Sequence, residues 1–171
     1  MRGHMEIMAP GVYGVKTARS AVDREGGGLR LNHIGFVVDD IEGAVRVMSA
    51  LGLKKSTPPE PDPVQKVNAA FVEIVPDQGV YLELLEPVSG DSPISGHLEK
   101  GGGLHHLCFE VVDMDAACAR LGSEGYRCVT RPTACVGFDR SFGLEGTRIA
   151  FFLTPMRLLV ELVEKNGGGL R

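Results

Sequence analysis

An internal repeat constrains the fold of this chain more than any other feature of its sequence. When the first half is shifted so that His33 falls on His106, further identical residues of the two halves coincide. The coinciding pairs are Phe36 and Phe109, Val38 and Val111, Asp40 and Asp113, Ala44 and Ala117, and Gly52 and Gly125. Self-similarity at a fixed spacing is typical of one supersecondary unit used more than once. We therefore expect two related modules.

The same elements are predicted in the same order in both copies. Each copy opens with an apolar run typical of a buried strand, continues with an aspartate N-cap and apolar residues at helical spacing, and closes that helix at a glycine. The predicted strands are Leu31–Val38, Val67–Val75, Val80–Glu86, Leu104–Val112, Cys128–Thr130, Thr147–Thr154 and Leu158–Glu164, and the predicted helices span 41–51 and Asp113–Gly122. The pattern predicts an α+β fold in which tandem βαβββ modules form a curved mixed sheet.

The composition and periodicity of the chain predict where its segments begin and end. Residues 1–29 have no clear period and contain a glycine run, so we expect a flexible N-terminal extension. The first module is then 30–88, a linker helix occupies 89–103, the second module is 104–165, and 166–171 form a tail. Within the linker, Ser92–Lys100 is the predicted helical part.

Charge and composition exclude several classes of function. The net charge of −4, the absence of a basic run and the lack of tryptophan argue against a nucleic-acid partner. No apolar stretch approaches the roughly 18–20 residues that span a bilayer, and the N-terminus lacks a signal-peptide pattern, so we expect a cytoplasmic protein. The four cysteines, at 108, 118, 128 and 135, form no CxxC pair, and we interpret them as buried, reduced thiols.

Four residues break the apolar pattern at equivalent places in the two copies. His33 and His106 lie in the first strand of each module, and Glu83 and Glu161 lie inside the last. A carboxylate among apolar neighbours on a central strand is costly unless it is paired or bound to a cation. Two imidazoles and two carboxylates suit Zn²⁺, Mn²⁺, Co²⁺, Ni²⁺ or Fe²⁺. We therefore predict a divalent-metal site shared by the two modules.

We assign no metal-binding role to three residues near these four, His105, Glu86 and Glu164. His105 points to the opposite face of its strand from His106 because side chains alternate, so we interpret it as a supporting or structural residue. Glu86 and Glu164 are expected to face solvent.

The residues 31–164 resemble the glyoxalase/bleomycin-resistance/dioxygenase superfamily, also called the vicinal-oxygen-chelate fold, and within it methylmalonyl-CoA epimerase-like proteins. The segments that carry the resemblance are LNHIGFVVDDIEGAV, LELLEPVSGDSPISGHLEKGGGLHHLCFEVVDMDAA and RIAFFLTPMRLLVELVE. The resemblance implies metal ligands at His33, Glu83, His106 and Glu161, with Glu161 also acting as a catalytic acid/base.

The chain departs from that pattern at the second catalytic base. The resemblance places this base near Ala69, which cannot move a proton. Glu73 shares the strand face of Ala69 about 13 Å further along, at ~3.3 Å per residue, and is the catalytic residue we predict instead. The loop before Arg148 also differs from the epimerase form, and its Asp139 and Arg140 are candidates for binding a substrate carboxylate or phosphate.

Three functions remain open from the sequence. The first is a metal-dependent isomerase or epimerase that stabilises an enolate of an acyl-CoA or other acyl thioester. The second is a glyoxalase-type lyase or a biosynthetic tailoring enzyme, and the third is a metal-free small-molecule-binding or resistance protein of the same fold. For each of these we expect a homodimer, because short modules with exposed sheet edges often pair symmetrically.

Overall fold

The computed structural model describes residues 29–55, 57–75, 79–134 and 147–164. In chain order its elements are β1 (Arg30–Val37), α1 (Ile41–Ala50), β2 (Lys54–Lys55), β3 (Glu60–Asp62), β4 (Val67–Val75), β5 (Val80–Pro87), α2 (Ser95–Leu98), β6 (Gly103–Val111), α3 (Met114–Ser123), β7 (Arg127–Ala134), β8 (Arg148–Leu153) and β9 (Leu159–Glu164). The predicted extension 1–29 lies outside this range except for its last residue, and so does the predicted tail 166–171.

All strands of the described ranges belong to one mixed sheet. Its order is β2-β4-β5-β1-β6-β9-β8-β7, and β3 pairs with β4 beside β2. The first and last strands of each module are parallel, β1 with β5 and β6 with β9. The modules join through the antiparallel pair β1 and β6, which cross between the two halves of the molecule. The predicted α+β fold of tandem βαβββ modules in a curved mixed sheet is confirmed.

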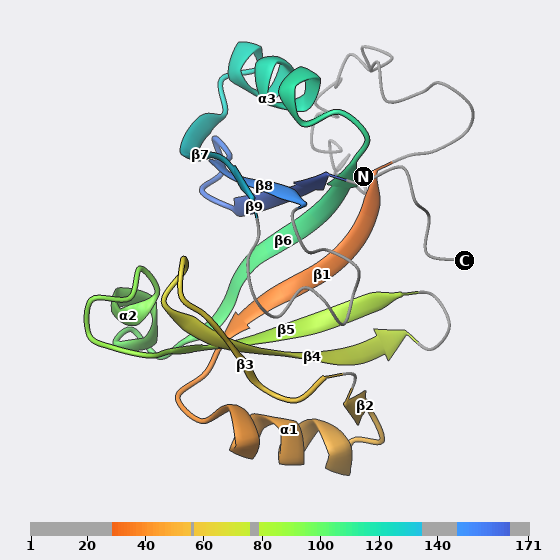
Figure 1. Cartoon of the computed structure of the whole chain (residues 1–171), viewed down its shortest axis with the longest axis vertical. Coiled ribbons are helices and arrows are strands. Elements are labelled where there is room, and N and C mark those ends of the chain that lie inside the picture. Colours follow the sequence, from red (N-terminus) through yellow and green to blue (C-terminus); the bar gives the residue numbers. More distant parts are fainter. Residues whose placement is uncertain (1–28, 56, 76–78, 135–146, 165–171) are drawn as a thin grey trace, which may run out of the picture.

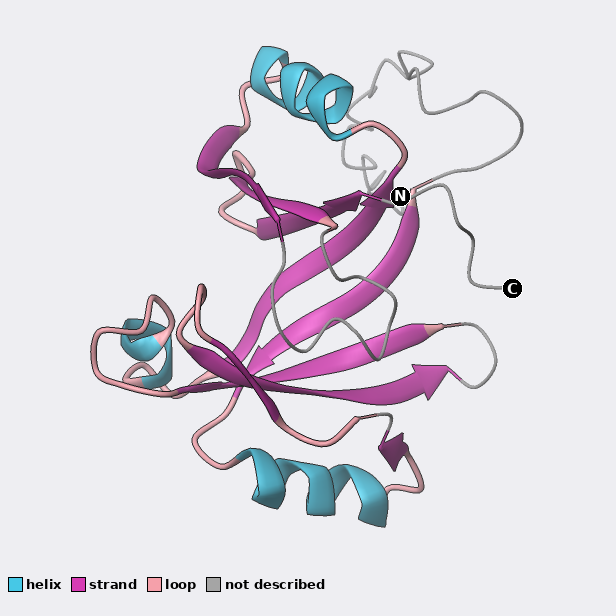
Figure 2. Cartoon of the chain, in the orientation of Figure 1, coloured by secondary structure: helices cyan, strands magenta, loops and turns pink. Residues whose placement is uncertain are grey.

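One helix covers each half of the sheet from outside (Figures 1 and 2). Ile41 and Val45 of α1 pack with Leu84 of β5, and Met114 and Ala117 of α3 occupy the corresponding place in the second module. Burial of these apolar faces, rather than helix propensity, holds such short helices. In the described residues no helix is long and apolar enough to cross a membrane.

The helices α1 and α3 each begin with two carboxylates that accept hydrogen bonds from the helix backbone. Asp40 accepts from the Gly43 N–H and Asp113 from the Ala116 N–H, both at 2.9 Å. Glu86 accepts from the Ile41 N–H at 3.4 Å, and Glu164 accepts from the Met114 N–H at 2.9 Å. The expectation that Glu86 and Glu164 simply face solvent is therefore wrong, because both are half-buried and bind free N–H groups at helix starts.

Other differences from the predicted elements lie in the irregular segments. The segment between α1 and β4 contains the short strands β2 and β3, which the sequence did not predict and which pair with β4. The linker helix is only the four residues of α2, and β7 extends well beyond the predicted Cys128–Thr130. Burial of the thiols holds for Cys108, whereas Cys118 is half-buried and Cys128 is exposed, and all three are free. Cys135 lies outside the described residues.

Candidate metal centre

The inner, concave face of the sheet carries the four residues predicted from the repeat. His33 lies on β1, Glu83 on β5, His106 on β6 and Glu161 on β9, so each comes from one of the four central strands. Their exposed fractions are 4%, 5%, 1% and 5%. Strand alternation directs all four side chains to the same side, because neighbouring residues on the paired strands share a face.

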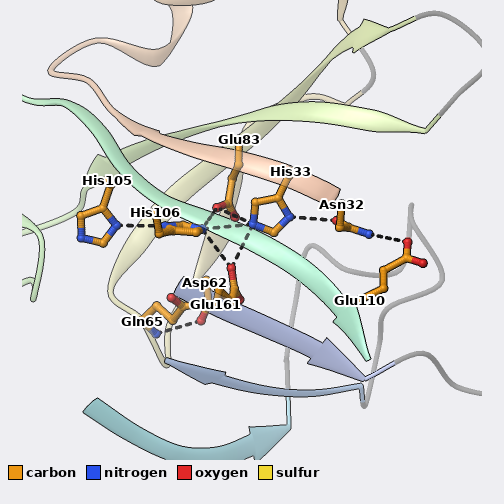
Figure 3. Close-up of polar contacts among 9 residues, drawn as sticks. All are labelled: Asn32, His33, Asp62, Gln65, Glu83, His105, His106, Glu110 and Glu161. Atoms are coloured by element: carbon orange, nitrogen blue, oxygen red, sulfur yellow. Dashed lines mark hydrogen bonds and ion pairs between the residues drawn. The ribbon is translucent and has the colours of Figure 1, made fainter. Parts of the chain in front are cut away.

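The four side chains converge on one point (Figure 3). His33 Nε2 and His106 Nε2 each lie 2.9 Å from Glu161 Oε2 and 3.3 Å from Glu83 Oε2. The two histidine nitrogens are 3.1 Å apart. One donor atom from each residue therefore lies within 4.8 Å of all the others. Two neutral imidazoles and two carboxylates in this arrangement form an N₂O₂ set that fits a divalent transition-metal ion.

Gly35 makes the approach of His106 possible. Gly35 on β1 is paired with His106 on β6. A Cβ atom added at Gly35 would lie 2.1 to 2.7 Å from the Cε1, Nδ1 and Nε2 atoms of the His106 ring. The His106 imidazole therefore lies against the backbone of Gly35. Because Gly35 has no side chain, the ring can approach closely enough for His106 Nε2 to join the cluster.

Opposite charges shift the pKa values of the cluster in opposite directions. Burial alone lowers the pKa of His33, but Cys108 and Glu83 outweigh it and raise that pKa well above its ordinary value. Burial also lowers the pKa of His106, but Glu161 and Glu83 raise it overall. Conversely, burial favours the neutral carboxyl groups, yet the histidines hold the pKa of Glu83 far below its ordinary value and lower that of Glu161 to about 2. Without a cation, the carboxylates thus retain protons on the imidazoles.

A polar chain behind His33 fixes the orientation of its ring. His33 Nδ1 lies 2.9 Å from Asn32 Oδ1, which has only lone pairs, so the ring nitrogen donates. Asn32 Nδ2 in turn donates to Glu110 Oε1 at 3.1 Å. With Nδ1 protonated, neutral His33 presents the Nε2 lone pair to the cluster. Metal-bound histidines commonly have such a second partner, and the sequence interpretation missed Asn32 because an asparagine in a strand has no distinctive spacing.

His105 performs the same role for His106. The two Nδ1 atoms are 3.0 Å apart, and burial, followed by the charges of His106 and His97, lowers the pKa of His105 to about 4. Neutral His105 can accept the Nδ1–H of His106, and that tautomer presents His106 Nε2 to the cluster. The ring of His97 on α2 lies edge-on against His105 with centroids 5.1 Å apart. His105 thus supports the cluster directly, and α2 supports it through His97, which the sequence interpretation left without a role.

One phenylalanine packs edge-on against each histidine of the cluster. The ring of Phe71 is 5.6 Å from that of His33, and the ring of Phe151 is 5.4 Å from that of His106. The two positions are equivalent, because Phe71 is paired with Glu83 and Phe151 with Glu161. These apolar rings flank the cluster and strengthen electrostatic interactions within it by excluding water.

The position of the missing base, Ala69, and the predicted catalytic residue, Glu73, both lie on β4 and outside the cluster. Ala69 is buried in an apolar group with Phe71 and Leu85. Glu73 is half-buried and paired with Tyr81, two residues beyond Phe71. The candidate substrate-binding residues Asp139 and Arg140 lie outside the described residues.

Tandem βαβββ modules that curl around a buried two-histidine, two-glutamate cluster define the vicinal-oxygen-chelate class of protein. The profile of the Glyoxalase/Bleomycin resistance protein/Dioxygenase superfamily matches residues 32–151. The chain belongs to this superfamily.

Its similar proteins include named epimerases. The chain is 39% identical over 101 residues to the ethylmalonyl-CoA/methylmalonyl-CoA epimerase of Cereibacter sphaeroides, an overlap of 57% of this chain and 72% of that protein. It is 36% identical over 146 residues to the uncharacterized protein YqjC of Bacillus subtilis, covering 81% and 94% of the two chains. A Streptomyces coelicolor methylmalonyl-CoA epimerase, solved in complex with 2-nitronate-propionyl-CoA, aligns with a TM-score of 0.65 at 32% identity, covering 81% and 98%.

Proposed function

We propose that this protein is a metal-dependent epimerase or isomerase of acyl-CoA thioesters, with methylmalonyl-CoA as the first substrate to test. The observation that carries the proposal is the buried cluster of His33, Glu83, His106 and Glu161, whose donor atoms lie within 4.8 Å of one another. The similarity to named methylmalonyl-CoA epimerases supports the choice of substrate.

The four cluster residues would hold the metal through His33 Nε2, His106 Nε2 and one carboxylate oxygen each of Glu83 and Glu161. A bound divalent cation supplies Lewis-acid stabilisation of negative charge that develops on a carbonyl oxygen. Asn32 and His105 keep the imidazoles in the Nε2-presenting form. Phe71 and Phe151 exclude water beside them.

Glu161 is our first acid/base residue. A carboxylate at the cluster can take a proton from the carbon next to the thioester carbonyl and later return one. Glu73 of β4 is the further catalytic residue predicted from the sequence alone, and a Glu73→Gln variant tests that prediction.

A glyoxalase-type lyase or a biosynthetic tailoring enzyme is the second candidate. The observation in its favour is the buried apolar group of Ala69, Phe71 and Leu85, which stands where the resemblance places a second base. A reaction that removes and returns a proton on one face of the substrate needs only one carboxylate, so it does not require a second base there. A cytoplasmic location and a homodimer stay predictions.

Two measurements test the proposal. Elemental analysis of protein purified without a metal-affinity step should find about one transition-metal ion per chain, and a His33→Ala/His106→Ala variant should lose it. The metal-loaded protein, incubated with a single epimer of methylmalonyl-CoA in deuterated water, should incorporate deuterium at the α-carbon and produce the other epimer. Incorporation without inversion would favour the second candidate. No metal in the wild type, even after adding Co²⁺, Mn²⁺, Ni²⁺ or Zn²⁺, would refute both.

A further inference from the structure

We infer that Glu60, on the short strand β3, is the second acid/base group of this site, a step that rests on the proposed epimerase function. Inversion at a carbon requires that a proton leaves one face and another arrives on the opposite face. Glu161 is anchored on β9, at one side of the cluster, and serves one face. A second proton-carrying side chain must therefore approach from the other side, where β4 and β3 lie.

The register of β3 directs Glu60 to the concave face. Glu60 is paired with Ala69 of β4, and directly paired residues project to the same side of a sheet. Ala69 in turn shares its face with Phe71, two residues away on the same strand. Since the ring of Phe71 packs on that of His33, the side chain of Glu60 emerges on the side of the sheet that carries the cluster.

Ala69, the partner of Glu60 on β4, carries only a methyl group. Ala69 is 1% exposed and belongs to an apolar group with Val67 and Phe71. Its methyl group fills little space, and a glutamate side chain is long enough to cross about one strand spacing of ~4.8 Å. The carboxylate of Glu60 can therefore lie above Ala69. Glu60 itself is half-buried, and no hydrogen bond or ion pair with another residue of the described ranges holds its carboxylate elsewhere.

The two other carboxylates on this side of the sheet have different surroundings. Asp62 is 2% exposed and accepts hydrogen bonds from the Val64 and Gln65 N–H groups and from the Gln65 side chain, so it holds the turn after β3 (Figure 3). Glu73 has an interaction of its own, and it lies beyond Phe71, toward the opposite end of β4 from Ala69. Of the three carboxylates, Glu60 is the one paired with Ala69, the position on β4 that has no acid/base side chain of its own.

The proton balance of an inversion then needs no further reactant. The Glu60 carboxylate removes the α-proton from one face of the acyl group, and the C–H electron pair moves to the thioester carbonyl oxygen to form an enolate. Protonated Glu161 delivers a proton to the opposite face as the carbonyl re-forms. For the other epimer the two residues exchange roles, and solvent exchange restores their starting protonation. Nothing is oxidised or reduced.

Four variants of the metal-loaded protein test the inference, each incubated with single epimers of methylmalonyl-CoA in deuterated water. Glu60→Gln should lower the rate of inversion by about 100-fold or more while it retains metal content and deuterium incorporation into the epimer whose proton faces Glu161. Glu60→Asp, which keeps the acid but shortens it, should lose less. Glu60→Gln/Ala69→Glu should recover inversion, because it returns a carboxylate to the same space. Glu124→Gln, at the exposed end of α3, is the matched control and should match the wild type.

The outcomes separate this inference from the proposed function. A wild type that neither exchanges nor inverts the substrate refutes the proposed function and the inference with it. Normal inversion in Glu60→Gln, or its loss in Glu73→Gln instead, refutes the inference alone. Glu60→Gln could also lose its metal or melt at a lower temperature than the wild type. In that case Glu60→Asp and the double variant Glu60→Gln/Ala69→Glu test the role of Glu60. Failure of both variants to recover inversion overturns that role.

Discussion

At the scale of single residues, the cluster depends on a position that carries no side chain. Gly35→Ala would place a methyl group within 2.1 to 2.7 Å of the His106 ring, and His106 is buried and cannot move aside freely. We expect a cost of about 1–3 kcal/mol in unfolding free energy, typical of overpacking, together with weaker metal binding. Chemical denaturation and metal titration measure the two effects.

Gly122→Ala is the matched control for Gly35→Ala. Gly122 lies on α3, and an added Cβ there meets no atom within 4 Å. Because alanine favours a helix by about 1 kcal/mol over glycine, this variant should be slightly more stable and bind metal normally. A Gly35→Ala protein with wild-type stability and metal affinity would show that the His106 ring does not depend on this contact.

The partners of the two imidazoles lead to a second prediction at this scale. Asn32→Leu removes the acceptor for the His33 Nδ1–H, and His105→Phe removes the acceptor for the His106 Nδ1–H. Each should lower metal affinity by about 10- to 100-fold, as loss of such outer partners usually does. His105→Asn retains an acceptor and should lose less. Metal titration with a competing chelator measures the affinities, and equal affinity in His105→Phe and the wild type would contradict the role of His105.

At the scale of elements, the helix starts distinguish two adjacent carboxylates. Asp39 and Asp40 both precede α1, and Asp40 is the N-cap, because it has extended backbone and accepts from the Gly43 N–H. Asp40→Ala should cost about 1 kcal/mol of stability. Asp39→Ala, the neighbouring control, should stay within about 0.5 kcal/mol of the wild type. Thermal or denaturant unfolding measures both, and equal losses would remove the basis for the cap.

Long elements of this fold could be predicted from the sequence, whereas its short strands could not. The strands of the repeat have long apolar runs, and the helices have a capping residue and a closing glycine, so their type and approximate ends could be predicted. By contrast, β2 and β3 exist only through pairing with β4, and neither has enough residues for a period. Glu86 and Glu164 look like polar ends of strands in sequence, and only the packing of α1 and α3 against the sheet brings helix N–H groups to them.

At the scale of the whole molecule, the repeat predicted which residues meet but not what supports them. Equivalent positions in two modules had to come together if the modules paired about a pseudo-twofold axis, and the antiparallel pair β1 and β6 produces that arrangement. Asn32, Phe71 and Phe151 could not be predicted in the same way. Their roles come from contacts between strands, which depend on the register of each pair.

The charge balance of the whole cluster predicts that metal binding depends on pH. The pKa values of His33 and His106 are raised in the metal-free protein, so both imidazoles hold protons at pH values above their ordinary 6.5. A metal needs the neutral imidazole, and binding must release these protons. Metal affinity should therefore increase as the pH rises above about 6.5, toward the raised pKa values of the two imidazoles. Calorimetric titration in buffers of different ionisation enthalpy measures the release, and an affinity independent of pH would contradict it.

Metal binding should also stabilise both modules together, because each supplies one histidine and one glutamate to a single cluster. A ligand present at about 1,000 times its dissociation constant adds about 4 kcal/mol to the unfolding free energy, or about 10 °C in melting temperature for a chain of this size. Treatment with a chelator should remove this gain. His33→Ala in the first module and His106→Ala in the second should each abolish it, whereas two independent sites would leave about half. Differential scanning calorimetry with and without added metal distinguishes these results, and retention of a partial metal-dependent gain in either variant would contradict a site shared by the two modules.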